Sequence, residues 1–206
     1  MILTDRDYKI LREVNRWGYS LGRHIKELCG FEGTRATDRR LKLLIEAGYL
    51  ERKKILYGVP SVYKLTYKGK ILIGANKRTE QVRIERIPHD MAVLDTVCFF
   101  VKKYQITTDD IISEKDLHSA DGFGNRSHKP DFIFTKGGKK HAVEVELTLK
   151  AKERLQKNIR DNYLSYDYQI WVVPEKENKI IKLLNEYQTK YDNLEIIFLK
   201  EVLKNV

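Results

Sequence analysis

The feature that most constrains the fold of this chain is a glycine pair, Gly137-Gly138, between two short apolar runs. Adjacent glycines supply the positive φ angles that a two-residue hairpin turn requires, so residues 129–150 are expected to form two antiparallel strands. Pairing outward from this turn places Asp131 directly opposite Glu144. The hairpin therefore brings two carboxylates together.

A third acid belongs to the same face of the predicted hairpin, because strand alternation places Glu146 beside Glu144 and Asp131. Paired strand positions have Cβ atoms about 4.5–5.5 Å apart, and like charges at that spacing destabilise the pair. Carboxylate oxygens so arranged suit Mg²⁺ or Mn²⁺. The alternative is an ordinary acidic face exposed to water. Acids are depleted in strands, and Ile133 and Ala142 share this face, so the pattern favours the metal site.

The excess positive charge lies in the first part of the chain. Residues 1–88 contain 20 lysines and arginines against 10 acids, whereas residues 89–206 contain 19 of each. The whole net charge of +10 therefore falls in the first 88 residues, a distribution typical of nucleic-acid binding. The alternative is a basic surface that serves solubility alone. Either way, the uneven charge predicts two domains.

Several classes of protein are excluded by composition. A run of 18 apolar residues, which a membrane helix needs, is absent from the sequence, and its first residues lack the apolar segment of a signal peptide. Cys29 and Cys98 are far apart and lack metal-ligand spacing. Two such cysteines fit a reducing compartment, so a cytoplasmic protein without a membrane partner is expected.

The basic region is expected to contain three helices and a hairpin. Thr4 and Asp7 form a predicted capping box at the start of a helix that ends near Trp17. Ser20 is the predicted cap of a second helix, and Thr34 opens a third that ends at Gly48. The third helix is expected to bury Ala36, Leu41, Leu44 and Ile45. Strands at 49–54 and 61–66, a turn at 57–60 and a short helix to Ala75 follow.

This order resembles a winged helix-turn-helix domain, here residues 1–76, with a linker at 77–88. The segments RRLKLLIEAGYLERKK and YKLTYKGKILI look like the corresponding segments of bacterial winged-helix proteins. The resemblance implies that the third helix enters the DNA major groove and that the hairpin, or wing, contacts the backbone. The implied DNA-binding residues are Arg35, Arg39, Lys42, Lys53, Lys54 and Lys64. Winged helices also mediate protein contacts, which is the alternative.

Residues 89–206 are expected to form a second domain of class α+β or α/β around a mixed sheet. The predicted order is a helix at 89–104, a strand at 110–117, a loop at 119–128, the hairpin, a helix at 150–166, a strand at 168–173, a helix at 176–190 and a strand at 194–199.

This order, with Pro130-Asp131 in one strand and Glu144-Val145-Glu146 in the next, resembles the PD-(D/E)XK, or restriction-endonuclease-like, nucleases. A winged helix ahead of the pattern PDFIF…HAVEVEL…K…Y is similar to the replication-relaxation family of plasmids and integrative elements. The resemblance implies an α-β-β-β-α-β nuclease-like core at 89–206, with Asp131, Glu144 and Glu146 as catalytic residues and ligands of Mg²⁺ or Mn²⁺. The implied activity is hydrolysis of DNA phosphodiesters.

One position departs from the nuclease signature, because Glu146 stands where the motif usually has lysine. By resemblance, Lys157 in the following helix is the preferred catalytic substitute. The other cations available there are Lys150, Lys152 and Arg160. A further acid is available from Asp90, Asp95 or Glu114, and His89 is a candidate general base.

The missing lysine leaves other functions open. One is a DNA-binding regulator of plasmid replication, transfer or transcription whose nuclease-like domain is inert. Another is an adaptor whose second domain binds a relaxase or a replication protein. A homodimer is plausible for either, since winged helices and nucleases of this kind often pair.

Overall fold

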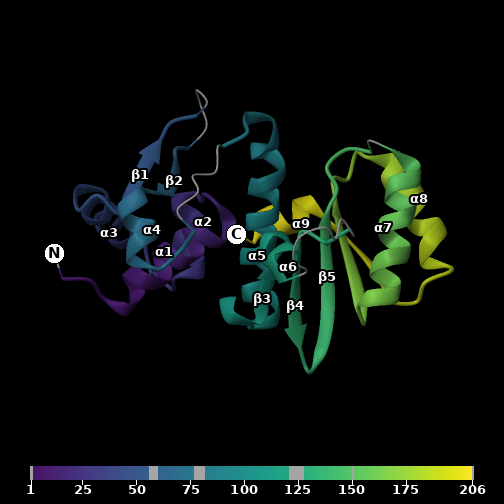
Figure 1. Cartoon of the computed structure of the whole chain (residues 1–206). Helices are drawn as coiled ribbons and strands as arrows, with labels where there is room; N and C mark the ends of the chain where they lie inside the picture. The colour runs from purple at the N-terminus through teal and green to yellow at the C-terminus, as the bar shows by residue number, and fades with distance from the viewer. Residues whose placement is uncertain (1, 56–59, 77–81, 121–127, 150, 206) are drawn as a thin grey trace. The chain divides into compact units, whose positions relative to one another are not determined.

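The structure is a computed structural model that describes residues 2–55, 60–76, 82–120, 128–149 and 151–205 (Figure 1). The chain divides into two compact units, Met1–Leu94 and Asp95–Val206. The division falls inside helix α5 (Ile87–Tyr104), rather than in the predicted linker. The first turns of α5 belong to the first unit, where the Tyr19 hydroxyl donates a hydrogen bond of 2.6 Å to Asp90.

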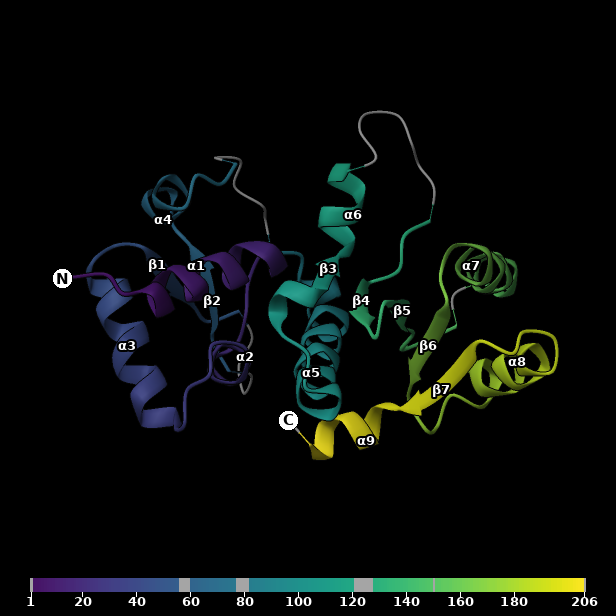
Figure 2. The same cartoon turned by 90° about the horizontal axis from the view of Figure 1, so that it is seen from below.

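The first unit packs helices against a two-stranded antiparallel sheet (Figure 2). Its elements are α1 (Asp5–Trp17), α2 (Gly22–Leu28), α3 (Thr34–Glu46), β1 (Leu50–Lys53), β2 (Val62–Leu65), α4 (Tyr67–Leu72), the short 3-10 helix η1 (Ile84–Arg86) and the start of α5. Their apolar faces meet in a core that includes Ile10, Leu11, Val14, Ile25, Leu41, Leu44 and Leu50. The predicted order of helices and strands is therefore confirmed, and η1 adds a helical turn inside the predicted linker.

Two details of the first unit differ from the predictions. Ser20 does not cap α2, because its backbone pairs with Tyr63 of β2 and Leu21 takes the N-cap position. In α3, Ala36 is exposed and Thr37 is buried instead. Thr37 tolerates burial because its hydroxyl donates to the carbonyl of Gly33 at 3.1 Å.

The second unit is built on a five-stranded sheet in the order β3-β4-β5-β6-β7. Its elements after α5 are the 3-10 helix η2 (Thr108–Asp110), β3 (Ile111–Ser113), α6 (Glu114–Ala120), β4 (Phe132–Lys136), β5 (Lys139–Val145), α7 (Lys152–Ser165), β6 (Tyr168–Val173), α8 (Asn178–Gln188), β7 (Leu194–Phe198) and α9 (Leu199–Lys204). The first three strands pair antiparallel and the last three parallel. The predicted α+β class with a mixed sheet is confirmed.

Helices cover both faces of this sheet (Figures 1 and 2). On one face, Phe100 of α5 packs against Phe132 and Phe134 of β4. On the other face, α7 and α8 pack against Trp171 and Val173 of β6. Because strand side chains alternate, each residue of β5 faces one of these two layers, and Glu144 pairs with Trp171 on the α7 side.

The hairpin between β4 and β5 has the predicted register. Ile133 lies opposite Ala142, and Gly137 and Gly138 have φ angles of 57° and 75°. Both glycines therefore adopt the left-handed conformation that the two-residue turn requires.

The strand predicted at 110–117 is wrong beyond Ser113. Ser113 and Asp116 form a reciprocal cap, in which the Ser113 hydroxyl donates to Asp116 at 2.8 Å and the Asp116 amide donates back to Ser113 Oγ at 3.3 Å. This cap starts α6 at Glu114, so Glu114 is a helical residue and not a strand residue.

Over the described residues, no helix is both long and apolar enough to cross a membrane.

Candidate functional site

Glu144 is the centre of a buried polar cluster in the second unit. It lies on β5 facing α7, and only 7% of its surface is exposed. Its Oε1 atom lies 2.5 Å from Nε2 of His128 and accepts a hydrogen bond of 2.9 Å from Nδ2 of Asn162 on α7. A carboxylate is costly to bury unless it is hydrogen-bonded, and here two side chains from different parts of the chain supply the partners.

Asp131 is fixed beside this cluster by the backbone of β5. Its Oδ2 atom accepts a hydrogen bond of 2.7 Å from the Val145 amide, and its carbonyl accepts one of 2.9 Å from the Glu114 amide. Asp131 precedes β4 directly, so it continues the register that places it next to Glu144. The structure therefore brings together the two acids that the hairpin predicts, and the alternative of an acidic face exposed to water is wrong for Glu144.

Burial and the charge of Asp131 shift the pKa values of Glu144 and His128. Burial raises the pKa of Glu144 to about 7, and Asp131 adds to the rise, although the contacts with His128 and Asn162 oppose it. Burial disfavours the charged form of His128, but the contact with Glu144 and the charges of Asp131 and Asp161 outweigh it and raise the pKa of the imidazole. The contact between the two side chains therefore favours the charged pair, and the burial of both groups opposes it.

The third predicted carboxylate does not complete a ligand set. Glu146 follows β5, its amide donates to the carbonyl of Val172 at 3.0 Å, and its side chain is half-buried. Among the residues that the structure describes, no group of three or more His, Cys, Asp or Glu side chains is placed to hold a metal ion. At Glu144, Oε1 is already engaged by His128 and Asn162. As arranged, these donors do not fit a resident Mg²⁺ or Mn²⁺, which needs several oxygen ligands directed at one point.

The predicted substitute for the missing lysine lies on the outer side of α7. Lys157 is exposed, as are Lys152 and Arg160, whereas Lys150 lies outside the described residues. The buried residues of α7 are Leu155, Asn158, Ile159 and Asn162. The helix therefore presents an amide, and not a lysine, to Glu144.

Asp90 and His89 lie together in the first unit. Asp90 accepts a hydrogen bond from Tyr19 and lies within 3.4 Å of His89 Nδ1 and 3.7 Å of Arg86 Nε. Burial raises the pKa of Asp90, but these partners outweigh it and lower the pKa overall. Asp90 is therefore held as a carboxylate by its own neighbours.

The other two candidate acids belong to the second unit. Asp95 is buried in α5. Glu114 opens α6, where its Oε1 atom lies 3.6 Å from His118 Nε2.

Two members of the cluster, His128 and Asn162, were missed by the sequence predictions. Asn158 and Asn162 are four residues apart within the apolar stripe of α7, and polar residues in such a stripe indicate a buried polar partner. That signal identifies the helix face that meets Glu144. For His128, no spacing or pattern in the sequence connects it with Glu144.

A second set of candidate residues lies on α3 of the first unit. Arg35, Arg39 and Lys42 are all exposed, and their spacing places them on one face of the helix together with Asp38. Lys42 Nζ lies 3.8 Å from Glu46, so one of these cations has a local carboxylate partner.

The residues predicted to form the wing separate into two groups. Lys53 and Lys54 are exposed at the end of β1, and residues 57–59 of the turn predicted at 57–60 lie outside the described part of the chain. Lys64 does not fit its predicted role, because only 10% of its side chain is exposed and its Nζ atom lies 4.0 Å from Glu51, its partner in the register.

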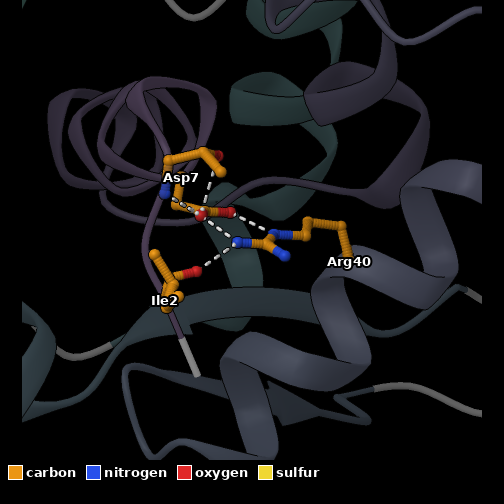
Figure 3. A network of polar contacts seen from close by, with 4 residues as sticks. Ile2, Asp7 and Arg40 are labelled. Atoms are coloured by element: carbon orange, nitrogen blue, oxygen red, sulfur yellow. Dashed lines mark hydrogen bonds and ion pairs between the residues drawn. The ribbon is translucent and has the colours of Figure 1, made fainter.

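The orientation of α3 is fixed by an ion pair with α1 (Figure 3). Arg40 donates from Nε and Nη2 to the carboxylate of Asp7, which is fully buried, and Nη2 also donates to the Ile2 carbonyl at 3.2 Å. The same carboxylate accepts from the amide and the hydroxyl of Thr4, at 2.7 and 2.9 Å, in the predicted capping box. Asp7 therefore starts α1 and anchors the helix that carries Arg39 and Lys42.

Comparison with known proteins does not assign the chain to a family. No protein-family model matches the chain, and no curated protein matches it significantly.

Proposed function

We propose that this chain is a DNA-binding protein and that α3 is its principal contact with the duplex. The observation that carries the proposal is the row of exposed cations Arg35, Arg39 and Lys42 on one face of α3, in the part of the chain that holds the whole excess of positive charge. An α-helix fits the major groove, and guanidinium groups pair with phosphates and with guanine edges. Lys53 and Lys54 at the end of β1 are the proposed contacts with the backbone.

The test is DNA affinity measured by fluorescence anisotropy over a range of salt concentrations. The variant Arg35→Ala/Arg39→Ala/Lys42→Ala is expected to bind duplex DNA more weakly and with a shallower salt dependence, by about 0.9 in the logarithmic slope for each phosphate that is no longer neutralised. The matched control removes three exposed cations of the second unit, Lys179→Ala/Lys182→Ala/Lys190→Ala, and should bind as the wild type does. If both variants bound DNA equally weakly, the net charge of the protein, and not the position of the cations on α3, would determine the affinity.

The resemblance to the replication-relaxation family supports a role on the DNA of a plasmid or an integrative element. Within that role, we favour a regulator whose second unit does not cut DNA, because His128 and Asn162 already engage Glu144. Footprinting should then find a protected site whose occupancy is unaffected by Asp131→Ala and by divalent ions. The adaptor hypothesis predicts instead that a relaxase or replication protein binds residues 89–206 without DNA.

A second candidate function, metal-dependent hydrolysis of DNA, is favoured by the position of Asp131 beside Glu144. The nuclease signature requires two carboxylates on adjacent strands, and the Val145 amide holds Asp131 in that place. The test is cleavage of supercoiled and branched DNA with Mg²⁺ or Mn²⁺ by the wild type and by Asp131→Ala/Glu144→Ala. Cleavage that the double variant loses would establish the nuclease; its absence from the wild type on every DNA form would exclude it.

A further inference from the structure

Asp38 lies among the three exposed cations of α3 that are proposed to contact DNA. Arg35 precedes it by three residues and Lys42 follows it by four, so the three side chains share one face of the helix. Asp38 is exposed on this face, as its neighbours are. A carboxylate here repels the phosphates that the cations attract, so Asp38 does not contribute to binding of the DNA backbone.

An ion pair along the helix is the local alternative for Asp38, and the structure does not form one. Lys42 Nζ lies 3.8 Å from Glu46 instead. Within the described ranges, the carboxylate of Asp38 makes neither a hydrogen bond nor an ion pair. The anchor of α3 is Arg40, which binds Asp7 from nearly the opposite side of the helix (Figure 3). The carboxylate of Asp38 is therefore available to a ligand.

The chemistry of the major groove restricts what a carboxylate can bind there. An ionised carboxylate only accepts hydrogen bonds. Phosphate oxygens, guanine O6 and N7, and thymine O4 are also acceptors and repel it, whereas the N4 amine of cytosine is a donor. Adenine presents its N6 amine beside the acceptor N7, which suits an amide better than a carboxylate. In such a groove the N-terminal turns of a helix meet the base edges, and Asp38 lies within the first two turns of α3.

We infer that Asp38 makes DNA binding by α3 selective for sequence, by accepting a hydrogen bond from the N4 amine of a cytosine in the major groove. The inference rests on the proposed contact of α3 with duplex DNA. It adds the class of site that is bound, one with a G·C pair facing Asp38. The guanine of that pair presents O6 and N7 to an arginine, and Arg35 and Arg39 flank Asp38 in the sequence. The helix therefore carries a donor for the guanine and an acceptor for the cytosine.

The test is selection of binding sites from a randomised duplex library by the full chain, followed by sequencing of the bound DNA. The wild type should enrich sites with cytosine at one defined position, and replacing that base should weaken binding about tenfold, a usual effect of one mismatched base pair. Asp38→Asn should shift the preference at that position from cytosine to adenine, because an amide pairs with adenine N6 and N7. Asp38→Ala should accept all four bases there.

The matched control is Glu46→Gln, which removes another exposed acid of α3 and changes the net charge as much as Asp38→Asn does. This variant should select the wild-type site. An unchanged preference in both Asp38 variants, or a wild type that binds the library without enriching any sequence, would overturn the inference and leave DNA binding intact. A wild type that retains no DNA from the library would overturn the proposed function as well.

Discussion

At the scale of single residues, Asp7 makes more stabilising contacts in the first unit than its place in a capping box predicts. The reciprocal contact with Thr4 is visible in the sequence as a local pattern, and the structure confirms it. The ion pair with Arg40 links positions far apart in the chain, so no local pattern indicates it. The cap formed by Thr4 and Asp7 is therefore predictable from neighbouring residues, whereas the contact that orients α3 is not.

Replacing Asp7 with asparagine should lower the free energy of unfolding by about 1–3 kcal/mol at neutral pH, because Arg40 and the Thr4 amide lose their charged acceptor. Burial raises the pKa of Asp7, but Arg40 and Thr4 outweigh it and lower the pKa overall. A lowered carboxyl pKa contributes stability above the unfolded value, about 3.9, that is lost as pH falls through the folded value. Urea unfolding at pH 7 and pH 3 should therefore show a difference between wild type and variant that shrinks in acid.

The control for this prediction is Asp5→Asn, which removes an exposed acid from the same first turn of α1. It should change the free energy of unfolding by about 0.3–1 kcal/mol at most, which is the usual contribution of an exposed charge near a helix terminus. Equal costs for both substitutions would mean that the helix dipole, and not Arg40, makes Asp7 important.

Asn162 permits a similar prediction in the second unit. Asn162→Ala leaves the buried Glu144 with one hydrogen-bond donor fewer, so the free energy of unfolding should fall by about 1–3 kcal/mol. The control is Tyr163→Ala at the next position, which is exposed and contacts Tyr191. Thermal unfolding that ranks Tyr163→Ala as the more damaging substitution would contradict a structural role for the amide of Asn162.

At the scale of elements, the sequence predicts the structure best where the residues of a short segment allow few backbone conformations. The Gly137-Gly138 turn fixes the register of β4 and β5 and hence the neighbourhood of Asp131 and Glu144. The region after Ser113 is predicted poorly, because the apolar residues favour a strand while the Ser-x-x-Asp pattern at Ser113 starts a helix. His128 is the extreme case, since tertiary structure alone brings it to Glu144.

The junction between β1 and α4 yields a prediction at this scale. A Cβ atom at Gly69 would lie 2.2 Å from the Tyr49 carbonyl and 2.8 Å from Leu65 Cδ2, so α4 approaches the chain before β1 too closely for any side chain. Gly69→Ala should destabilise the protein by about 1–3 kcal/mol through overpacking, as measured by thermal unfolding. Gly33→Ala is the matched control, because its added methyl group meets open space. If both variants unfold alike, the close approach at Gly69 is not a constraint.

At the scale of the whole molecule, the two units differ in charge and have separate cores, and the chain holds one tryptophan in each. Trp17 ends α1 in the first unit, and Trp171 is buried in β6 of the second. Leu41 and Ile159 are buried in the corresponding cores. Replacing either with alanine should cost about 2–5 kcal/mol in its own unit, because a large-to-small change leaves a cavity.

The two cores should therefore unfold as separate transitions that fluorescence can distinguish. In a Trp17→Phe background, the remaining signal comes from Trp171 and reports the second unit alone. Denaturant unfolding followed by this signal should shift to lower urea for Ile159→Ala and stay in place for Leu41→Ala. The Trp171→Phe background should show the opposite result. If Leu41→Ala moved both signals equally, the two units would unfold together in one cooperative transition.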